Sequence, residues 1–357
     1  MDATISKTTV SGHISQQEGK IATEPRTISL FAGCGGLDLG FHNSGFNIVW
    51  ANDNFREAAL TYEKNIGPID TRDITKVDAN EVPDADIVIG GFPCQPFSNA
   101  GNRKGTADSR GTLFWDAMRF VKAKDPKVVV FENVRGLLSI KNPDGTKLIA
   151  GIIRELEEAG KGYNVKYELL RASDYGVPQN RYRVVIVGVR KDLGKSFIFP
   201  EKQSREGLEL KHVLKGMPIN DPNDEHWELS PQSKKLIIHI PPGGSWKSVP
   251  IEHLPERLLK IRADMKRYHA PNFYRRFGLN EISGTVTAAA TPENSGILHP
   301  FENRRFTVRE IARIQTFPDW FIFQGKSTSS KYKQIGNAVP PQLGAVIARE
   351  IRKQIFA

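Results

Sequence analysis

Short apolar runs, each followed by a longer stretch of mixed polar and apolar residues, recur through the first half of the chain. The runs span residues 28–31, 48–50, 87–89, 128–131 and 184–189. Runs of this length suit buried strands, and the stretches between them are long enough for helices. The alternation of strands and helices predicts an α/β fold built on a parallel sheet.

This rhythm stops at residue 191 and resumes after residue 304. Nine prolines between residues 200 and 271 interrupt any long periodic element there. Helical spacing returns over residues 306–316 and 343–355. We therefore expect one domain from residues 27–190 and 305–357, and a smaller irregular domain over 191–304. Residues 1–26 are polar and aperiodic, which predicts a flexible leader.

Composition narrows the class of protein. The 357 residues contain 50 Lys and Arg against 40 Asp and Glu, giving a net charge of +10. This excess suits a polyanionic partner. Only two cysteines occur, Cys34 and Cys94, which argues against a disulfide framework or a cysteine-based zinc site. No membrane span or signal peptide is visible, so we expect a cytoplasmic protein.

Basic and aromatic residues are mixed over residues 257–276. Seven Lys or Arg and four aromatic or His side chains accompany a single acid, Asp264. Such mixing suits phosphate contact together with packing against bases or sugars. A solvated helix face followed by a loop is the alternative.

A glycine turn follows the first apolar run, with the sequence FAGCGG at residues 31–36. Glycines let the backbone approach a ligand closely, although a purely structural turn is the alternative. Asp53 follows the second run, where nucleotide-binding sheets hold ribose hydroxyls. Asp73 is expected either at the next strand tip, facing an adenine amino group, or as a helix N-cap.

The sequence GGFPCQPFS at residues 90–98 follows the third run. Prolines on both sides hold Cys94 rigidly at the carboxyl edge of the sheet, where open α/β sheets bind ligands. Cys94 is therefore placed like a nucleophile. Cys34, in contrast, is expected to be an inert small apolar residue.

Polar residues also follow the fourth run and directly precede the fifth. Glu132 begins the sequence ENV, and Arg181 and Arg183 lie in QNRYR at residues 179–183. Because parallel strands bring their carboxyl ends side by side, we expect Cys94, Glu132 and the arginine pair to converge on one substrate.

These motifs together resemble the cytosine-5 DNA methyltransferase family. The resemblance runs from Thr27 onward through six motifs in the family's order. They are FAGCGG, PCQ at residues 93–95, ENV, QNRYR, RRFTVREIARIQTFP at residues 304–318 and YKQIGNAVP at residues 332–340. The resemblance implies a Rossmann-like fold that uses S-adenosylmethionine, with a smaller target-recognition domain.

The resemblance also implies catalytic roles. C5 of cytosine is a weak nucleophile, so the Cys94 thiolate would first add to C6. Glu132 would protonate or hydrogen-bond N3, and Arg183 would contact O2. Arg181 would contact DNA or position the loop, and Gln95 and Ser98 would hold the active-site loop and a phosphate.

By the same resemblance, S-adenosylmethionine would lie against the glycine turn, with Asp53 at its ribose. Family members more often carry glutamate at that position. Asp73 and Ile74 would meet the adenine. The remaining cofactor-binding residues would be Phe31, Gly33, Gly35, Gly36, Leu37, Pro93, Leu113, Asn337 and Val339.

The implied partner is double-stranded DNA. A cytosine inside a duplex cannot reach Cys94, so the base must flip into the cleft between the domains. Thr285 and Val286 resemble the family's Thr-apolar pair in the recognition region. The small size favours a bacterial restriction-modification enzyme, acting as a monomer without metal. A cognate restriction endonuclease would act on the same site without stable association.

Two other functions remain open at this stage. A tRNA cytosine-5 methyltransferase shares the catalytic motifs, but that branch carries a Cys-Phe-Thr tripeptide which this chain lacks, and residues 191–304 form an unusually irregular segment. A catalytically dead nucleic-acid-binding module would require a broken reactive set, whereas Cys94, Glu132 and Arg183 are all present.

Overall fold

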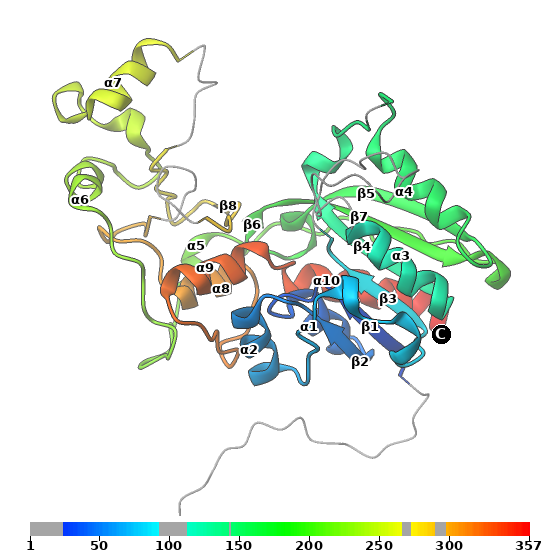
Figure 1. Cartoon of the computed structure of the whole chain (residues 1–357). Helices are drawn as coiled ribbons and strands as arrows, with labels where there is room; N and C mark the ends of the chain where they lie inside the picture. Colours follow the sequence, from blue (N-terminus) through cyan, green and yellow to red (C-terminus); the bar gives the residue numbers. More distant parts are fainter. Residues whose placement is uncertain (1–23, 93–112, 143, 266–272, 290–297) are drawn as a thin grey trace, which may run out of the picture.

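The computed structural model describes residues 24–92, 113–142, 144–265, 273–289 and 298–357, and Figure 1 shows their arrangement. A six-stranded sheet in the order β2-β1-β3-β4-β7-β5 forms its centre. The strands are β1 (Arg26–Leu30), β2 (Asn47–Asn52), β3 (Ile87–Gly90), β4 (Val128–Val134), β5 (Tyr163–Arg171) and β7 (Tyr182–Arg190). The predicted α/β fold with a mostly parallel sheet is confirmed.

The fifth expected strand runs in the opposite direction to the prediction. Strands β1 to β4 pair in parallel, but β7 lies antiparallel to both β4 and β5. β5 was not expected, because Lys166, Tyr167, Glu168 and Leu169 are exposed along this edge strand and hide any alternation. With β5 inserted before it, β7 can follow as an antiparallel neighbour after a short connection.

The N-terminal boundary also shifts slightly. β1 begins at Arg26, one residue inside the expected leader, and residues 1–23 lie outside the described ranges.

β4 continues through Glu132 to Val134, whereas the apolar run predicted that the strand would end before Glu132. Glu132 is therefore held by ladder hydrogen bonds on a strand, not on a loop.

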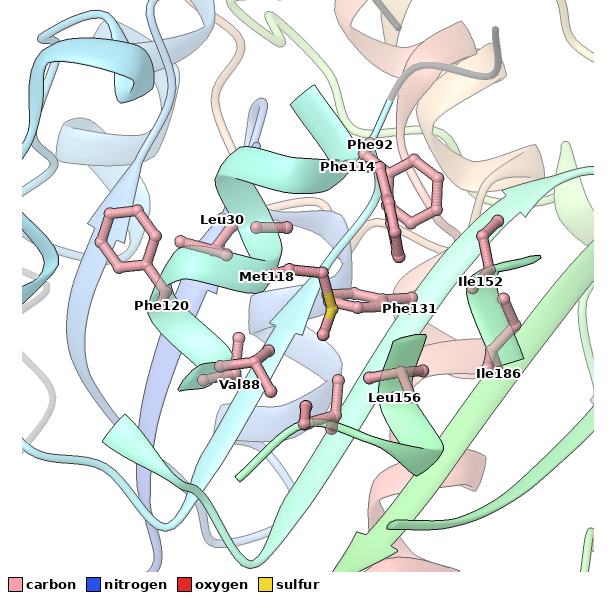
Figure 2. Packing of buried hydrophobic residues seen from close by; sticks show 14 of the residues in the cluster. Leu30, Val88, Phe92, Phe114, Met118, Phe120, Phe131, Ile152, Leu156 and Ile186 are labelled. Atoms are coloured by element: carbon pink, nitrogen blue, oxygen red, sulfur yellow. The ribbon is translucent and has the colours of Figure 1, made fainter. Parts of the chain in front are cut away.

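Helices cover both faces of the sheet, since its strands are apolar on both sides. On one face lie α3 (Leu113–Lys124) and α4 (Leu148–Glu157). Figure 2 shows Phe114 and Met118 of α3 packed close to Phe131 of β4. On the other face lie α1 (Gly36–His42) and α10 (Pro341–Ile351). The C-terminal helix α10 thus packs on the same face of the sheet as α1, near the start of the chain.

A further apolar cluster joins parts that are distant in sequence. It packs α2 (Arg56–Asn65) and α5 (Leu210–Val213) against α8 (Val308–Ile314) and α9 (Thr328–Asn337). Helices were expected over residues 306–316 and 343–355, and α8 and α10 occupy these stretches. A π-helical turn, Arg352–Phe356, follows α10.

Residues 229–298 contribute a separate apolar core around Trp246, which is fully buried. This part carries α6 (Pro231–Ile237) and α7 (Glu256–Ala263), which stand apart from the sheet in Figure 1. Two short strands, β6 (Gln179–Asn180) and β8 (Ser283–Gly284), pair in parallel and tie it to the sheet domain. No helix in the described ranges is long and apolar enough to cross a membrane.

Candidate active site

A cavity of about 760 Å³ opens at the carboxyl ends of β1, β3 and β4. Its wall combines these strand ends with the turn after β2 and the end of α9. Among the described residues, the wall includes Phe31, Gly33, Gly36, Leu37, Asp53, Leu113, Glu132, Arg183, Asn337 and Val339. Topology therefore brings most of the expected cofactor and catalytic residues around one space.

The glycine turn has the geometry of a close ligand approach. Phe31, Gly33 and Gly35 all have positive φ, at 56°, 57° and 88°. Such values are strained for Phe31 but natural for glycine. At Gly36 an added Cβ would lie 2.2 Å from Val339 O, so any side chain there would displace the cavity wall. Strain at Phe31 and close contact at Gly36 support a binding turn rather than an ordinary one.

Asp53 fixes this turn. Its two carboxylate oxygens accept hydrogen bonds from Gly33 N and Phe55 N, both at 2.8 Å. Burial raises the pKa of Asp53, while these hydrogen bonds act against the rise. Because each carboxylate oxygen can accept more than one hydrogen bond, Asp53 retains capacity for hydroxyl groups of a ligand.

Glu132 and Arg183 form an ion pair at the cavity wall. Arg183 Nε lies 2.6 Å from Glu132 Oε1, and both side chains are 11% exposed. The antiparallel ladder sets Val134 opposite Arg183, so the start of β7 meets the end of β4. The two residues converge as expected, but through antiparallel pairing rather than the parallel pairing that was assumed.

The Glu132 carboxylate has an unused acceptor. The contact with Arg183 is close, but the N–H group is not directed along it, and Glu132 Oε1 has no hydrogen-bond partner. A buried carboxylate oxygen without a donor is costly. A ligand that donates a hydrogen bond at this point would remove that cost.

The chain before the cysteine motif is anchored. Asn133 Nδ2 donates to Phe92 O at 2.9 Å, and both residues are buried. Phe92 is the last described residue before the cysteine. Pro93, Cys94, Gln95 and Ser98 lie outside the described residues, so their expected roles stay predictions.

Arg181 does not fit a DNA contact. It is completely buried and donates to the main-chain carbonyls of Val286, Gly336 and Ala338. Burial and the neighbouring Arg183 lower the pKa of Arg181. The guanidinium presents no surface to DNA, so the expected alternative, a positioning role, replaces DNA contact for this residue.

Thr285 is tied to the sheet domain. Its Oγ1 donates to Asn180 O at 2.9 Å, next to the β6–β8 pairing. The hydroxyl is only half-buried, so a DNA contact by Thr285 stays a prediction.

Three expected residues lie away from the cavity wall. Gly35 is the N-cap of α1, and Ile74 is buried in the core beneath α3. Asp73 follows no strand; it caps the 3₁₀ turn Ile74–Lys76 by accepting from Thr75 N. Its strand-tip placement is therefore wrong and the N-cap interpretation is confirmed, while contact of Asp73 and Ile74 with adenine stays a prediction.

Cys34 behaves as expected for an apolar residue. It is 2% exposed, and burial raises the pKa of its thiol. A thiol that resists ionisation is a poor nucleophile.

The structure divides the basic cluster of residues 257–276. Arg276 is buried and donates to carbonyls, and Arg275 pairs with Glu281 at 2.5 Å. Arg262 and Lys260 are exposed, although Arg262 also donates to Val249 O. Lys266 and Arg267 lie outside the described ranges. Within those ranges, only the exposed members remain suited to phosphate contact.

Two residues that line the cavity were not predicted from the sequence. Asp38 is fully buried and lines it, accepting from Ser29 Oγ and Tyr62 OH, both at 2.7 Å. Its signal was an acid within the apolar stretch GLDLGF of residues 36–41. Lys333 also lines the cavity, with its ammonium 4.5 Å from the Phe55 ring centre.

The fold and cavity define a class, namely α/β proteins with a ligand-sized cavity at the carboxyl edge of the sheet, where open α/β sheets bind nucleotide-like ligands. The family model of the C-5 cytosine-specific DNA methylases matches residues 25–353. The chain belongs to this family. The resemblance seen in the sequence is thereby confirmed, and the chain is a DNA cytosine-5 methyltransferase.

Known relatives are similar in sequence to this chain over most of its length. It is 40% identical to the type II methyltransferase M.NgoFVII of Neisseria gonorrhoeae, covering 92% of this chain and 87% of the relative. It is 33% identical to the type II methyltransferase M.HhaI of Haemophilus parahaemolyticus, covering 90% and 92%. These matches favour DNA over the tRNA alternative.

Solved structures share the fold. The crystal structure of a prophage-encoded E. coli chain, described as a DNA modification methyltransferase, aligns with a TM-score of 0.66 at 25% identity. The alignment covers 94% of this chain and all of that one. The S. pombe Dnmt2 methyltransferase aligns at 18% identity with a TM-score of 0.59, which shows the fold alone.

Proposed function

We propose that this enzyme transfers a methyl group from S-adenosylmethionine to C5 of a cytosine that has flipped out of a short, specific duplex sequence. The observation that carries the proposal is the Glu132–Arg183 pair with its unpartnered Glu132 Oε1. It lies on the wall of the same cavity as the strained glycine turn and Asp53. One space can thus hold a cofactor beside a cytosine, whose exocyclic amino group can donate a hydrogen bond to Glu132 Oε1.

The cofactor-binding residues are those of the cavity wall. Asp53 would hold the ribose hydroxyls, and the turn of Phe31, Gly33 and Gly36 would lie against the ligand. Leu113 and Val339 supply apolar surface for the adenine or the aliphatic chain. S-adenosylmethionine supplies an electrophilic methyl group when bound. Asp53 is one methylene shorter than glutamate, and its carboxylate is held in place by hydrogen bonds from Gly33 N and Phe55 N.

The catalytic residues act on the base in sequence. The Cys94 thiolate forms a bond to C6, while Glu132 in its protonated form donates to N3 and Arg183 donates to O2. Electron density would then gather at C5, which could attack the methyl group while the bond from that methyl to sulfur breaks and the sulfur leaves as a neutral thioether. Loss of the C5 proton to a base restores the double bond and breaks the bond between C6 and Cys94.

The recognition residues are proposed to lie in the segment 191–304. A base stacked inside duplex DNA cannot reach the sheet edge, so it must rotate out into the cavity. The net charge of +10 favours approach to the phosphate backbone. Thr285, Gln95 and Ser98 are the proposed DNA-contacting residues.

The biological role is proposed to be DNA modification in a bacterial restriction-modification system. The curated relatives are type II methyltransferases that span nearly the same length as this chain. We propose a monomer in the cytoplasm, with a cognate endonuclease that recognises the same sequence without binding the methyltransferase stably.

Bisulfite sequencing of DNA from cells that express the protein tests this proposal. One short sequence should show protected cytosines throughout the genome, and cells that express Glu132→Gln should show far fewer. If no sequence is protected although the wild-type protein accumulates in folded form, the proposed activity is wrong, and a binding module without catalysis takes its place.

A further inference from the structure

Arg181 joins two main-chain segments that are 50 residues apart in the sequence. Its Nη1 donates to Val286 O at 2.9 Å, and its Nη2 donates to Gly336 O at 2.8 Å and Ala338 O at 3.0 Å. Within the described ranges no carboxylate forms an ion pair with it, and its Nε has no partner. A fully buried guanidinium held only by carbonyls is costly, so these particular contacts require an explanation.

The two segments belong to different working parts. Val286 follows β8 in the recognition segment, whereas Gly336, Asn337 and Ala338 form the end of α9 and line the cofactor cavity. They also touch directly. An added Cβ at Gly336 would lie 2.4 Å from the carbonyl carbon of Thr287. The cavity wall and the recognition segment are therefore packed main chain against main chain.

A second link runs beside Arg181. Gln179 Oε1 accepts from Val286 N at 2.9 Å, and Gln179 Nε2 donates to Gln315 Oε1 at 2.7 Å. Gln315 Nε2 donates in turn to Ile335 O at 2.6 Å. Both glutamines are fully buried. Two connected polar paths, rather than one contact, fix the recognition segment to the end of α9.

We infer that Arg181 is a positioning residue that couples occupation of the cofactor cavity to the placement of the recognition segment. This inference rests on the proposed cofactor site. A ligand that orders the main chain at Asn337 also orders the Gly336 and Ala338 carbonyls that Arg181 holds. Through Val286 the same guanidinium then fixes the segment that meets DNA. Because such coupling is reciprocal, bound DNA tightens the cofactor by the same factor.

The coupling factor can be measured without catalysis. The affinity for a duplex that carries the enzyme's target sequence, still unmethylated, is determined with and without saturating S-adenosylhomocysteine, the demethylated cofactor. For the wild type we expect the ratio of dissociation constants to be at least about 5, the lower end of typical coupling. For Arg181→Met we expect a ratio within about twofold of 1, although each ligand still binds alone. Arg181→Lys places a single ammonium where the guanidinium contacts two segments, so this variant should recover only part of the wild-type ratio.

Three further variants separate coupling from folding. Arg349→Met removes an exposed arginine of α10 and should keep the wild-type ratio. Gly336→Ala forces the two segments apart while leaving Arg181 intact, and should also bring the ratio close to 1. If Arg181→Met does not fold, Gly336→Ala tests the coupling in its place. Gly67→Ala, with open space around its added Cβ, is the matched control.

Two results would overturn the inference while leaving the proposed function standing. One is a wild type that binds both ligands with a ratio near 1. The other is a folded Arg181→Met or Gly336→Ala protein that keeps the wild-type ratio. A wild type that fails to bind S-adenosylhomocysteine at all instead refutes the proposed cofactor site, and the inference falls with it.

Discussion

Asp38 shows how a single residue beneath the cavity can be costly at neutral pH. Burial raises its pKa to about 6, although the hydroxyls of Tyr62 and Ser29 donate to it and partly oppose the rise. Because the folded-state pKa lies above the ordinary value of 3.8, the folded protein prefers the protonated acid. The stabilising contribution of Asp38 is present below pH 4 and is lost as the pH rises through 6.

Asp38→Asn should therefore become relatively more stable as the pH rises. The difference in unfolding free energy between variant and wild type should shift in favour of the variant by up to about 3 kcal/mol between pH 4 and pH 7. Urea unfolding at several pH values measures this shift. A difference that stays constant over the whole range would show that Asp38 titrates normally.

At the residue scale, the reactive side chains could be predicted from the sequence more reliably than the packing environment of each side chain. Glu132 and Arg183 were correctly predicted to converge, because Glu132 follows the fourth apolar run and Arg183 directly precedes the fifth, and antiparallel pairing brings these two ends together. Arg181 was paired with them by its spacing alone. Nothing in the sequence distinguishes a buried arginine held by carbonyls from one that faces DNA, since the carbonyl partners lie more than 100 residues away.

At the element scale, α1 and α10 control the position of the cavity wall. Gly40 of α1 lies against the first turn of α10, where an added Cβ would come within 2.5 Å of Pro341 O and Ala345 N. α10 directly follows Asn337 and Val339, which line the cavity. A displacement of α10 is therefore transmitted to the proposed cofactor site.

Gly40→Ala should lower both stability and cofactor affinity. Overpacking against main-chain atoms typically costs about 1–3 kcal/mol. Thermal unfolding and calorimetric titration with S-adenosylhomocysteine measure the two effects. Gly67→Ala should change neither, since its added Cβ meets no atom within 4 Å. Equal melting temperatures for Gly40→Ala and wild type would show that α10 moves freely past α1.

The elements that could be predicted are those with continuous burial. β1, β3 and β4 are buried throughout or nearly so, and their apolar runs were visible. β5 is an exposed edge strand with mixed polar and apolar residues, so its pattern resembles a loop. Missing β5 led directly to the wrong direction for β7, because the helical crossover from β4 leads to β5 and the short connection from β5 then reverses the chain.

At the scale of the whole molecule, the recognition part carries its own core. The cluster around Trp246 draws only on residues 229–298. Residues closer to position 191 pack elsewhere, since Phe197 joins the core of the sheet domain and Leu210 packs against α8. The independent core is thus shorter than the irregular segment 191–304, whose prolines mark a change in pattern rather than a change of core.

Exchanging the segment 191–304 for that of a relative should change the methylated sequence. The catalytic pair and the cavity wall lie outside the exchanged part, so activity should persist. Bisulfite sequencing identifies the new site. A hybrid that remains active on the original sequence would show that specificity lies in the sheet domain. In the hybrid, the main chain at position 286 should keep its hydrogen bonds with Gln179 and Arg181, because these bonds use only main-chain atoms of that position.

The central claim is that Cys94 attacks C6 of a flipped cytosine with the help of Glu132. The adduct is released only by loss of the C5 proton, and fluorine at C5 cannot leave as a cation. A duplex with 5-fluorocytosine at the methylated position, incubated with S-adenosylmethionine, should therefore trap a protein–DNA adduct that survives denaturant. Cys94→Ser should form none, because its hydroxyl is a weak nucleophile at neutral pH. Glu132→Gln should form the adduct at least about 10²-fold more slowly than the wild type. A denaturant-stable adduct with Cys94→Ser, or none with the folded wild type, would contradict the account.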